Sequence, residues 1–371
     1  MFTDAPFFLI AAAALAIPLV AKAAFHHSIC KKEWAIQTVI MVVAMVGIYG
    51  GLMSAQTSDV RVQNGELASK HRDRVSCSHS YSCNCRQVST GTKGETRQEC
   101  DTCYEHSHDY NWILVTTVGD LKVDRIDRQG RREPPRFTSA TPGDPVAVTE
   151  RWSNPIKGAP HSVFRGDVAT DDPMLEGTPA YPSDLRDIHY LDRVFAVRGA
   201  ELADQAATWD ARLADSLKTI GREKRGNAIL VFTGDANRSY ANVLERLWLR
   251  GKSNDTVVVM GVQNGAISWA ESFGWSQNPR LYVDLRNDLE GLTATPDAVL
   301  PVVEQAILLH FEETPPETFD HLAGDVTLPT WAILLLAFVT LGLSIGTTWW
   351  FHTHDTFDTQ RGRGRPFRSS F

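Results

Sequence analysis

The sequence predicts an α/β protein with a small Cys/His-stabilised region and three transmembrane α-helices. Three observations lead to this fold class. Helix-like and strand-like patterns alternate between about residues 198 and 313, which is typical of an α/β sandwich with a mixed sheet. Cysteines and histidines are concentrated in residues 77–108. Long apolar segments lie near both ends of the chain, whereas its middle part is polar.

Three apolar segments are long enough to cross a membrane, which takes about 20 helical residues for a hydrocarbon core of about 30 Å. They are residues 6–24, 35–54 and 329–351. The first segment also has features of a signal peptide, because residues 21–23 look like a small-residue cleavage site. However, Asp4 stands where a signal peptide has Lys or Arg. We favour an uncleaved span, with cleavage as the alternative.

Basic residues beside the spans predict their orientation. Lys31 and Lys32 lie between the first two spans. Four arginines follow the third span: Arg361, Arg363, Arg365 and Arg368. Because Lys and Arg in short flanks stay in the cytoplasm, residues 55–328 are expected outside it, with the C-terminus inside.

The net charge limits the class of partner. The whole chain carries −7, while residues 1–54 contribute +1 and residues 352–371 contribute +2, so the part between them carries −10. Binding to nucleic acid depends on Lys and Arg that neutralise phosphates. We therefore expect the lipid bilayer and a protein as partners, and no nucleic acid.

The same patterns predict how the chain is divided. In order, the parts are two transmembrane helices with a short basic loop (1–54), a stalk with the Cys/His cluster (55–112), an irregular β-rich region (113–197), the α/β domain (198–313), a linker (314–328), a transmembrane helix (329–351) and a basic cytoplasmic tail (352–371). In the α/β domain, periodicity predicts helices over 200–222, 239–250 and 296–311, and strands over 227–233, 255–262 and 266–273. The turn Gln263-Asn264-Gly265 predicts that the last two strands form a hairpin.

The Cys/His cluster carries the most specific chemical signal. Its members are Cys77, His79, Cys83, Cys85, Cys100, Cys103, His106 and His108. Thiolates and imidazoles at such spacings suit tetrahedral Zn²⁺, whose binding can replace a missing hydrophobic core. We expect one structural zinc ion with the ligands Cys77, Cys83, Cys103 and His106, in which Cys85 or Cys100 can substitute. His108 is expected to be a solvated neighbour.

Two alternatives to this zinc site stay open. The expected exterior location makes disulfides chemically natural. Five cysteines in residues 77–103 cannot all pair with one another, and a disulfide knot gives the three histidines no role. A mixture of metal site and disulfides is the second alternative.

Other signals for chemistry are weak. The chain has no P-loop, nucleophile-elbow, zinc-protease or dinucleotide-binding motif. Asp235 follows a predicted buried strand, at a position where α/β sheets often bind ligands, although an Asp in a turn is the more ordinary interpretation. Asp284, Asp288 and Glu290 are expected to form a solvated face.

The segment 198–313 resembles a TPM domain, an α/β module of thylakoid and bacterial membrane-associated proteins. The residues that carry this resemblance are GNAILVF (226–232), NDTVVVMGVQNGAISWAESFGW (254–275) and AVLPVVEQAILLHF (298–311). It implies an α/β domain tethered beside a transmembrane helix. Some members are linked to phosphatase activity or calcium binding, but this sequence has no acidic cluster that matches such a site.

Nearly the whole chain also resembles uncharacterised membrane proteins encoded by tailed bacteriophages. The motifs are CSHSYSCNC (77–85), CDTCYEHSHDYNW (100–112), RIDRQGRREPPRF (125–137) and WLRGKSNDTVVVMGV (248–262). This resemblance implies a phage protein in the bacterial inner membrane, with its polar part in the periplasm and a protein partner in the host envelope or the phage.

These observations favour a membrane-anchored interaction module that is not an enzyme. The first alternative is a periplasmic metal-dependent hydrolase, such as a phosphatase, in which Asp235 and nearby acids hold the metal. The second is a virion or assembly component embedded in a membrane.

Overall fold

The computed structural model describes residues 5–24, 29, 31–89, 96–159, 173–182 and 192–354. The chain divides into two compact units. The first comprises Met1–Asp59, Arg151–Asp167 and Pro315–Phe371, and the second comprises Val60–Glu150 and Val168–Thr314. Cys30 and the four tail arginines lie outside the described residues.

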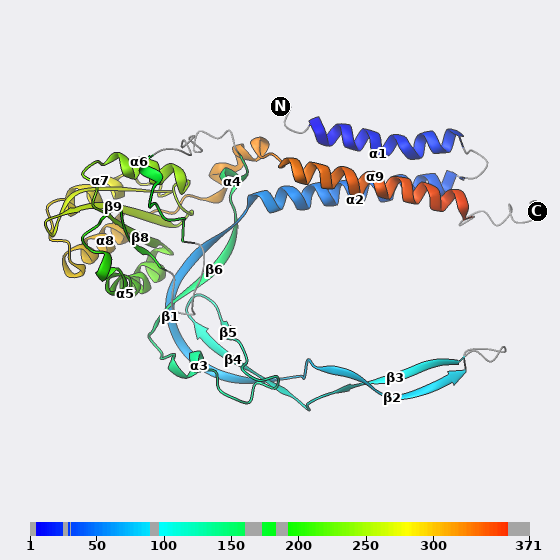
Figure 1. Cartoon of the computed structure of the whole chain (residues 1–371), viewed down its shortest axis with the longest axis horizontal. Helices are drawn as coiled ribbons and strands as arrows, with labels where there is room; N and C mark the ends of the chain where they lie inside the picture. Colours follow the sequence, from blue (N-terminus) through cyan, green and yellow to red (C-terminus); the bar gives the residue numbers. More distant parts are fainter. Residues whose placement is uncertain are drawn as a thin grey trace, which may run out of the picture. The chain divides into compact units, whose positions relative to one another are not determined.

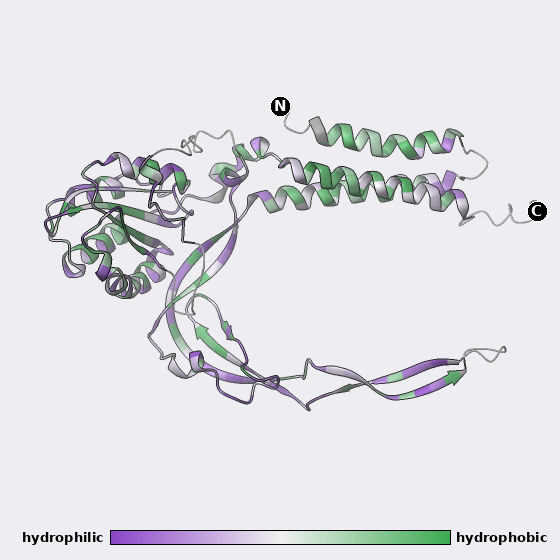
Figure 2. Cartoon of the chain, in the orientation of Figure 1, coloured by the Kyte–Doolittle hydropathy of each residue, from purple (hydrophilic) through white to green (hydrophobic). Residues whose placement is uncertain are grey.

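The first unit contains the three expected apolar helices, α1 (Ala5–Ala24), α2 (Lys31–Thr57) and α9 (Thr330–Thr353), which lie side by side (Figure 1). Each is long and apolar enough to cross a membrane, and hydrophobic residues cover most of their length (Figure 2). The prediction of three membrane-spanning segments is confirmed in length and composition. Two short helices, α4 (Pro155–Gly158) and η3 (Pro316–Asp325), belong to the same unit.

Polar side chains join these three helices. The Nε2 atom of the fully buried Gln37 donates hydrogen bonds to Thr347 Oγ1 at 3.0 Å and to Thr348 Oγ1 at 2.7 Å. The hydroxyl of Ser344 donates to the carbonyl oxygen of Ala14 at 2.8 Å. Because lipid offers polar groups no partners, such hydrogen bonds favour a packed three-helix bundle.

Most of the first sheet belongs to the second unit. Its strands are β1 (Ser58–Val75), β4 (Asp109–Thr116), β5 (Leu121–Val123) and β6 (Pro145–Ser153), in the order β5-β4-β1-β6. Leu67, Trp112 and Leu114 pack there in a small core with Phe137 of the short helix α3 (Pro135–Ser139). The sequence predicts a polar stalk where the structure has β1. Its buried start is lined by Arg61, Gln63 and Asn64, which make hydrogen bonds, so hydrophobic alternation gives no signal there.

The α/β part of the second unit is built around a mixed sheet in the order β10-β9-β8-β7. Its strands are β7 (Val194–Val197), β8 (Asn227–Thr233), β9 (Asp255–Gln263) and β10 (Ala266–Gly274). Strands β7, β8 and β9 are parallel, and β10 is antiparallel to β9. The helices are α5 (Ala206–Lys224), α6 (Ser239–Leu247), α7 (Arg280–Leu289) and α8 (Pro296–His310).

Alternate residues of the central strands point to opposite faces of the sheet and pack into two separate hydrophobic cores. Leu230 and Phe232 of β8 pack with residues of α5, α7 and α8, whereas Ile229 and Val231 pack with residues of α6. The sheet therefore has helices on both faces, as Figure 1 shows. The mixed α/β class is confirmed. Helix α7 and the short strand β7 are not among the elements predicted from the sequence.

Candidate metal centre

The candidate metal centre lies where the first sheet gives way to a two-stranded ribbon. Strands β1 and β4 pair antiparallel as far as Val75 and Asp109. Beyond this pair the chain continues into β2 (Ser80–Ser89) and β3 (Thr96–Tyr104), which pair only with each other (Figure 1). Every side chain of the centre belongs to this junction.

Four side chains converge at the junction. Cys77 and His79 come from the segment between β1 and β2, His106 from the segment between β3 and β4, and Asp109 is the first residue of β4. One ligand atom from each lies within 4.8 Å of all the others. The Sγ atom of Cys77 is 3.7 Å from His106 Nδ1 and 4.0 Å from His79 Nδ1. This group can hold a metal ion.

Asp109 is prepared to act as an anionic ligand. Its side chain is fully buried, and its Oδ2 atom accepts hydrogen bonds from the Ser78 N–H at 3.2 Å and from Arg125 at 2.9 Å. Burial by itself would raise the pKa of this carboxyl, but the hydrogen bonds from Ser78 and Arg125, together with the Cys77 thiol and the charge of Arg125, outweigh burial and lower the pKa to about 2. Its Oδ1 atom accepts no hydrogen bond and lies 3.3 Å from His106 Nδ1. A buried carboxylate oxygen without a donor is what a bound cation would satisfy.

The donor set suits a divalent metal ion. One thiolate and one carboxylate balance its two positive charges, and two imidazoles complete a set of four ligands. Arg125 would orient the ligand Asp109 from outside the coordination sphere, which is the usual arrangement around metal ligands. With four protein ligands no position is left for water or substrate, so the set is typical of a structural site rather than a catalytic one.

The other four cysteines of the Cys/His cluster form disulfides, and this corrects the predicted ligand set. Cys83 is bonded to Cys103, and Cys85 to Cys100, across the paired strands β2 and β3. A disulfide sulfur is not a thiolate and does not bind zinc as one. Of the expected ligands, only Cys77 and His106 belong to the group of four. The structure combines disulfides with a possible metal site, which corresponds to the second alternative, a mixture of metal site and disulfides.

His108 lies outside the group. Its Nε2 atom is 3.0 Å from the Tyr110 hydroxyl, and its Nδ1 atom is 3.1 Å from Arg74. Burial and the nearby positive charge of Arg74 lower the pKa of this imidazole. Asp109 and Arg125 were not predicted as parts of the site. Asp109 directly follows the His-rich run of residues 106–108, and this proximity was the one available signal.

Asp235 is engaged in an ion pair. Its carboxylate accepts a hydrogen bond from Arg198, which also donates to the carbonyl oxygens of Pro173 at 3.2 Å and Glu176 at 3.0 Å. These contacts fix a loop at the carboxyl ends of β7 and β8. Among the described residues, only Cys77, His79, His106 and Asp109 form a group of three or more metal-binding side chains that could share an ion.

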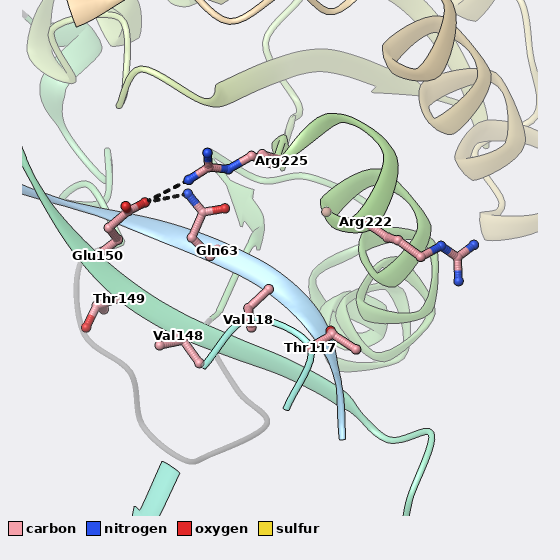
Figure 3. Close-up of a pocket in the computed structure, with 9 residues that line it drawn as sticks. Gln63, Thr117, Val118, Val148, Thr149, Glu150, Arg222 and Arg225 are labelled. Atoms are coloured by element: carbon pink, nitrogen blue, oxygen red, sulfur yellow. Dashed lines mark hydrogen bonds and ion pairs between the residues drawn. The ribbon is translucent and has the colours of Figure 1, made fainter. Parts of the chain in front are cut away.

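A cavity of about 540 Å³ lies beside β1, β6 and the end of α5 (Figure 3). Glu150 accepts hydrogen bonds there from Gln63 at 2.8 Å and from Arg225 at 3.4 Å. Burial would raise the pKa of Glu150, but the hydrogen bond from Gln63 and the charge of Arg61 outweigh burial and lower it. Arg222 points away from this group in Figure 3. The charged residues that line the cavity are Glu150, Arg222 and Arg225, and Glu150 is already paired with Arg225.

No protein-family model, curated protein or solved structure matches the chain.

Proposed function

We propose that this chain is a multi-pass protein of the bacterial inner membrane, encoded by a phage, that presents a periplasmic interaction module and is not an enzyme. In this proposal a structural Zn²⁺, held by Cys77, His79, His106 and Asp109, clamps the base of the ribbon formed by β2 and β3. The observation that carries the proposal is the convergence of these four side chains at the junction between sheet and ribbon. The α/β part with its TPM-like sequence serves as the binding domain.

The ribbon explains why a clamp is useful. A two-stranded sheet has no core of its own and is marginal in water. Two disulfides join its strands. Neither disulfide involves the segment between β1 and β2 (76–79) or the segment between β3 and β4 (105–108). The only backbone hydrogen bond that the structure gives between these segments joins the Glu105 N–H to the His79 carbonyl oxygen at 3.0 Å. A metal ion bound by both segments would fix the ribbon on the sheet.

The two disulfides also support a location outside the cytoplasm, because thiols are kept reduced inside it. The same location follows from Lys31, Lys32 and the basic tail. A hydrolase is a weaker alternative. Its expected metal ligand, Asp235, is paired with Arg198, and the four-residue group leaves no open coordination position.

The metal proposal predicts about one zinc ion per purified chain. The measurement is elemental analysis of the full chain in detergent, in a Cys30→Ser background. A thiol count under denaturing, non-reducing conditions should then find one thiol, that of Cys77. His106→Gln should remove most of the metal, whereas the matched variant His108→Gln should retain it, because His108 lies outside the group. Arg125→Met should weaken zinc binding by about 10–100-fold, as loss of a residue that orients a ligand usually does.

Three results would contradict this assignment. They are a metal-free chain with one thiol, zinc that survives His106→Gln, and zinc together with five thiols. The last result would restore the cysteine-rich ligand set expected from the sequence, with Cys77, Cys83, Cys103 and His106. Hydrogen exchange gives a further readout, since chelation should speed exchange in residues 77–112 while sparing β8 and β9.

The topology proposal is tested separately. Alkaline phosphatase fused after Phe371 should be inactive, because that enzyme folds only after export. The same reporter inserted at Gly143, in an exposed turn of the second unit, should be active. An active fusion at the C-terminus would reverse the proposed orientation.

A further inference from the structure

A second surface of the chain has the character of a binding groove. A hollow of about 600 Å³ lies between α5 and α8. Its apolar lining comes from α8 and consists of Pro296, Leu300, Pro301, Leu308 and Leu309, of which Leu300 also belongs to the core. The outward face of a surface helix is normally polar. In α8, Val299, Val303 and Ile307 pack into the core. Leu308 and Leu309 do not belong to this core, so they add apolar surface to the outside of the helix.

Leu309 shows this most clearly. This residue is 62% exposed, although it is a leucine on a well-formed helix. Single exposed leucines are common on protein surfaces, but an apolar floor inside a hollow with a polar rim is typical of a protein-binding site. Two neighbouring helices that enclose such a floor form the kind of groove that receives an amphipathic helix.

The rim is acidic. Of the charged side chains that line it, Asp215, Asp297 and Glu304 are negative and Arg212 is positive, which gives a net charge of −2. Lys218 forms an ion pair with Asp215 at 2.9 Å, so the rim together with this neighbour carries −1. Arg212 forms an ion pair with Asp297, and the exposed fractions of the two side chains are 55% and 80%. Exposed ion pairs are worth about 1 kcal/mol or less, so a partner could replace this one easily.

These features define the occupant. We propose that the groove between α5 and α8 binds an amphipathic helix of a partner protein, whose leucine-like side chains meet Leu308 and Leu309 and whose Lys or Arg side chains meet the acidic rim. A second copy of this chain would bring the same negative rim and a net charge of −7, so charge favours a different, basic partner. The inference rests on the proposed interaction role and gives that role a specific surface.

The test uses two synthetic helical peptides with identical leucine positions at i, i+3, i+4 and i+7. One peptide carries Lys at its polar positions and the other carries Glu. Binding to the full chain in nanodiscs of uncharged lipid is measured by fluorescence anisotropy, with empty nanodiscs subtracted. The Lys peptide should bind, and Leu309→Glu should weaken its binding at least tenfold. Leu247→Glu is the matched control, because Leu247 is a 41% exposed leucine on α6 that does not line the groove; binding should be unchanged in this variant.

A charge swap makes the result specific. The double variant Asp297→Lys and Glu304→Lys should reverse the preference, so that the Glu peptide binds more tightly than the Lys peptide. The groove assignment is overturned if the parent chain binds neither peptide, if Leu309→Glu binds like the parent, or if the swap leaves the preference unchanged. Zinc content is measured on the same samples. Zinc with no peptide binding refutes the groove alone, whereas peptide binding without zinc refutes the metal clamp alone.

Discussion

Leu230→Asp is expected to unfold the α/β part of the protein. Leu230 is fully buried at the centre of β8, between β7 and β9, and belongs to the core that also contains Trp209 and Phe232. An unpaired buried carboxylate costs several kcal/mol, about 3 or more. Loss of the leucine adds about 2–5 kcal/mol, as for Leu→Ala in cores. Because domains are stable by only about 5–15 kcal/mol, the sum approaches or exceeds the total.

Thermal unfolding of the purified full chain, followed by circular dichroism and limited proteolysis, checks this expectation. Leu230→Ala should give an intermediate loss of stability. Leu247→Asp serves as the control, because this leucine of α6 is partly exposed and its replacement should cost about 0.5 kcal/mol or slightly more. If Leu230→Asp kept the parent's transition, β8 would not be the central strand.

The sequence predicts β8 and the hairpin of β9 and β10 because local rules decide them. Residues 228–232 of β8 form a continuous apolar run, and all seven residues of the strand are buried. At the hairpin, Asn264 and Gly265 have φ values of 54° and 73°, which these two residue types adopt more readily than others. The three membrane helices are predicted equally well, because length and hydropathy alone identify them.

The elements that escape prediction depend on tertiary contacts. Strand β1 is polar in sequence, and hydrogen bonds from Arg61 and Asn64 to distant residues are what allow its start to be buried. The candidate metal centre is similar. Residue types and spacing identify the Cys/His cluster, but they do not reveal which cysteines face each other across β2 and β3. Nor could spacing show that Arg125 and the Ser78 N–H hold Asp109 beside His106.

Gly221→Ala is expected to destabilise the second unit, although the same change in an exposed helix normally stabilises it by up to about 1 kcal/mol. Gly221 lies near the end of α5, where the helix passes directly over β1. A Cβ atom added there would be 1.9 Å from the carbonyl oxygen of Asn64 and 2.6 Å from its carbonyl carbon. Both are backbone atoms, so no side-chain rotation can relieve the overlap.

Asn64 is also unable to move away. Its Nδ2 atom donates to the carbonyl oxygen of Gly226 at 3.1 Å, and its Oδ1 atom accepts from Arg193 at 2.6 Å, both in buried surroundings. The helix and the strand must therefore separate, and overpacking of this kind costs about 1–3 kcal/mol. A loss of about 2 kcal/mol should lower the melting temperature by about 4–8 °C. Gly324→Ala is the control, because no atom lies within 4 Å of its added Cβ. A Gly221→Ala variant at least as stable as the parent would mean that β1 does not pack against α5 here, and that the first sheet and the α/β part are joined less closely than the buried contacts of Asn64 imply.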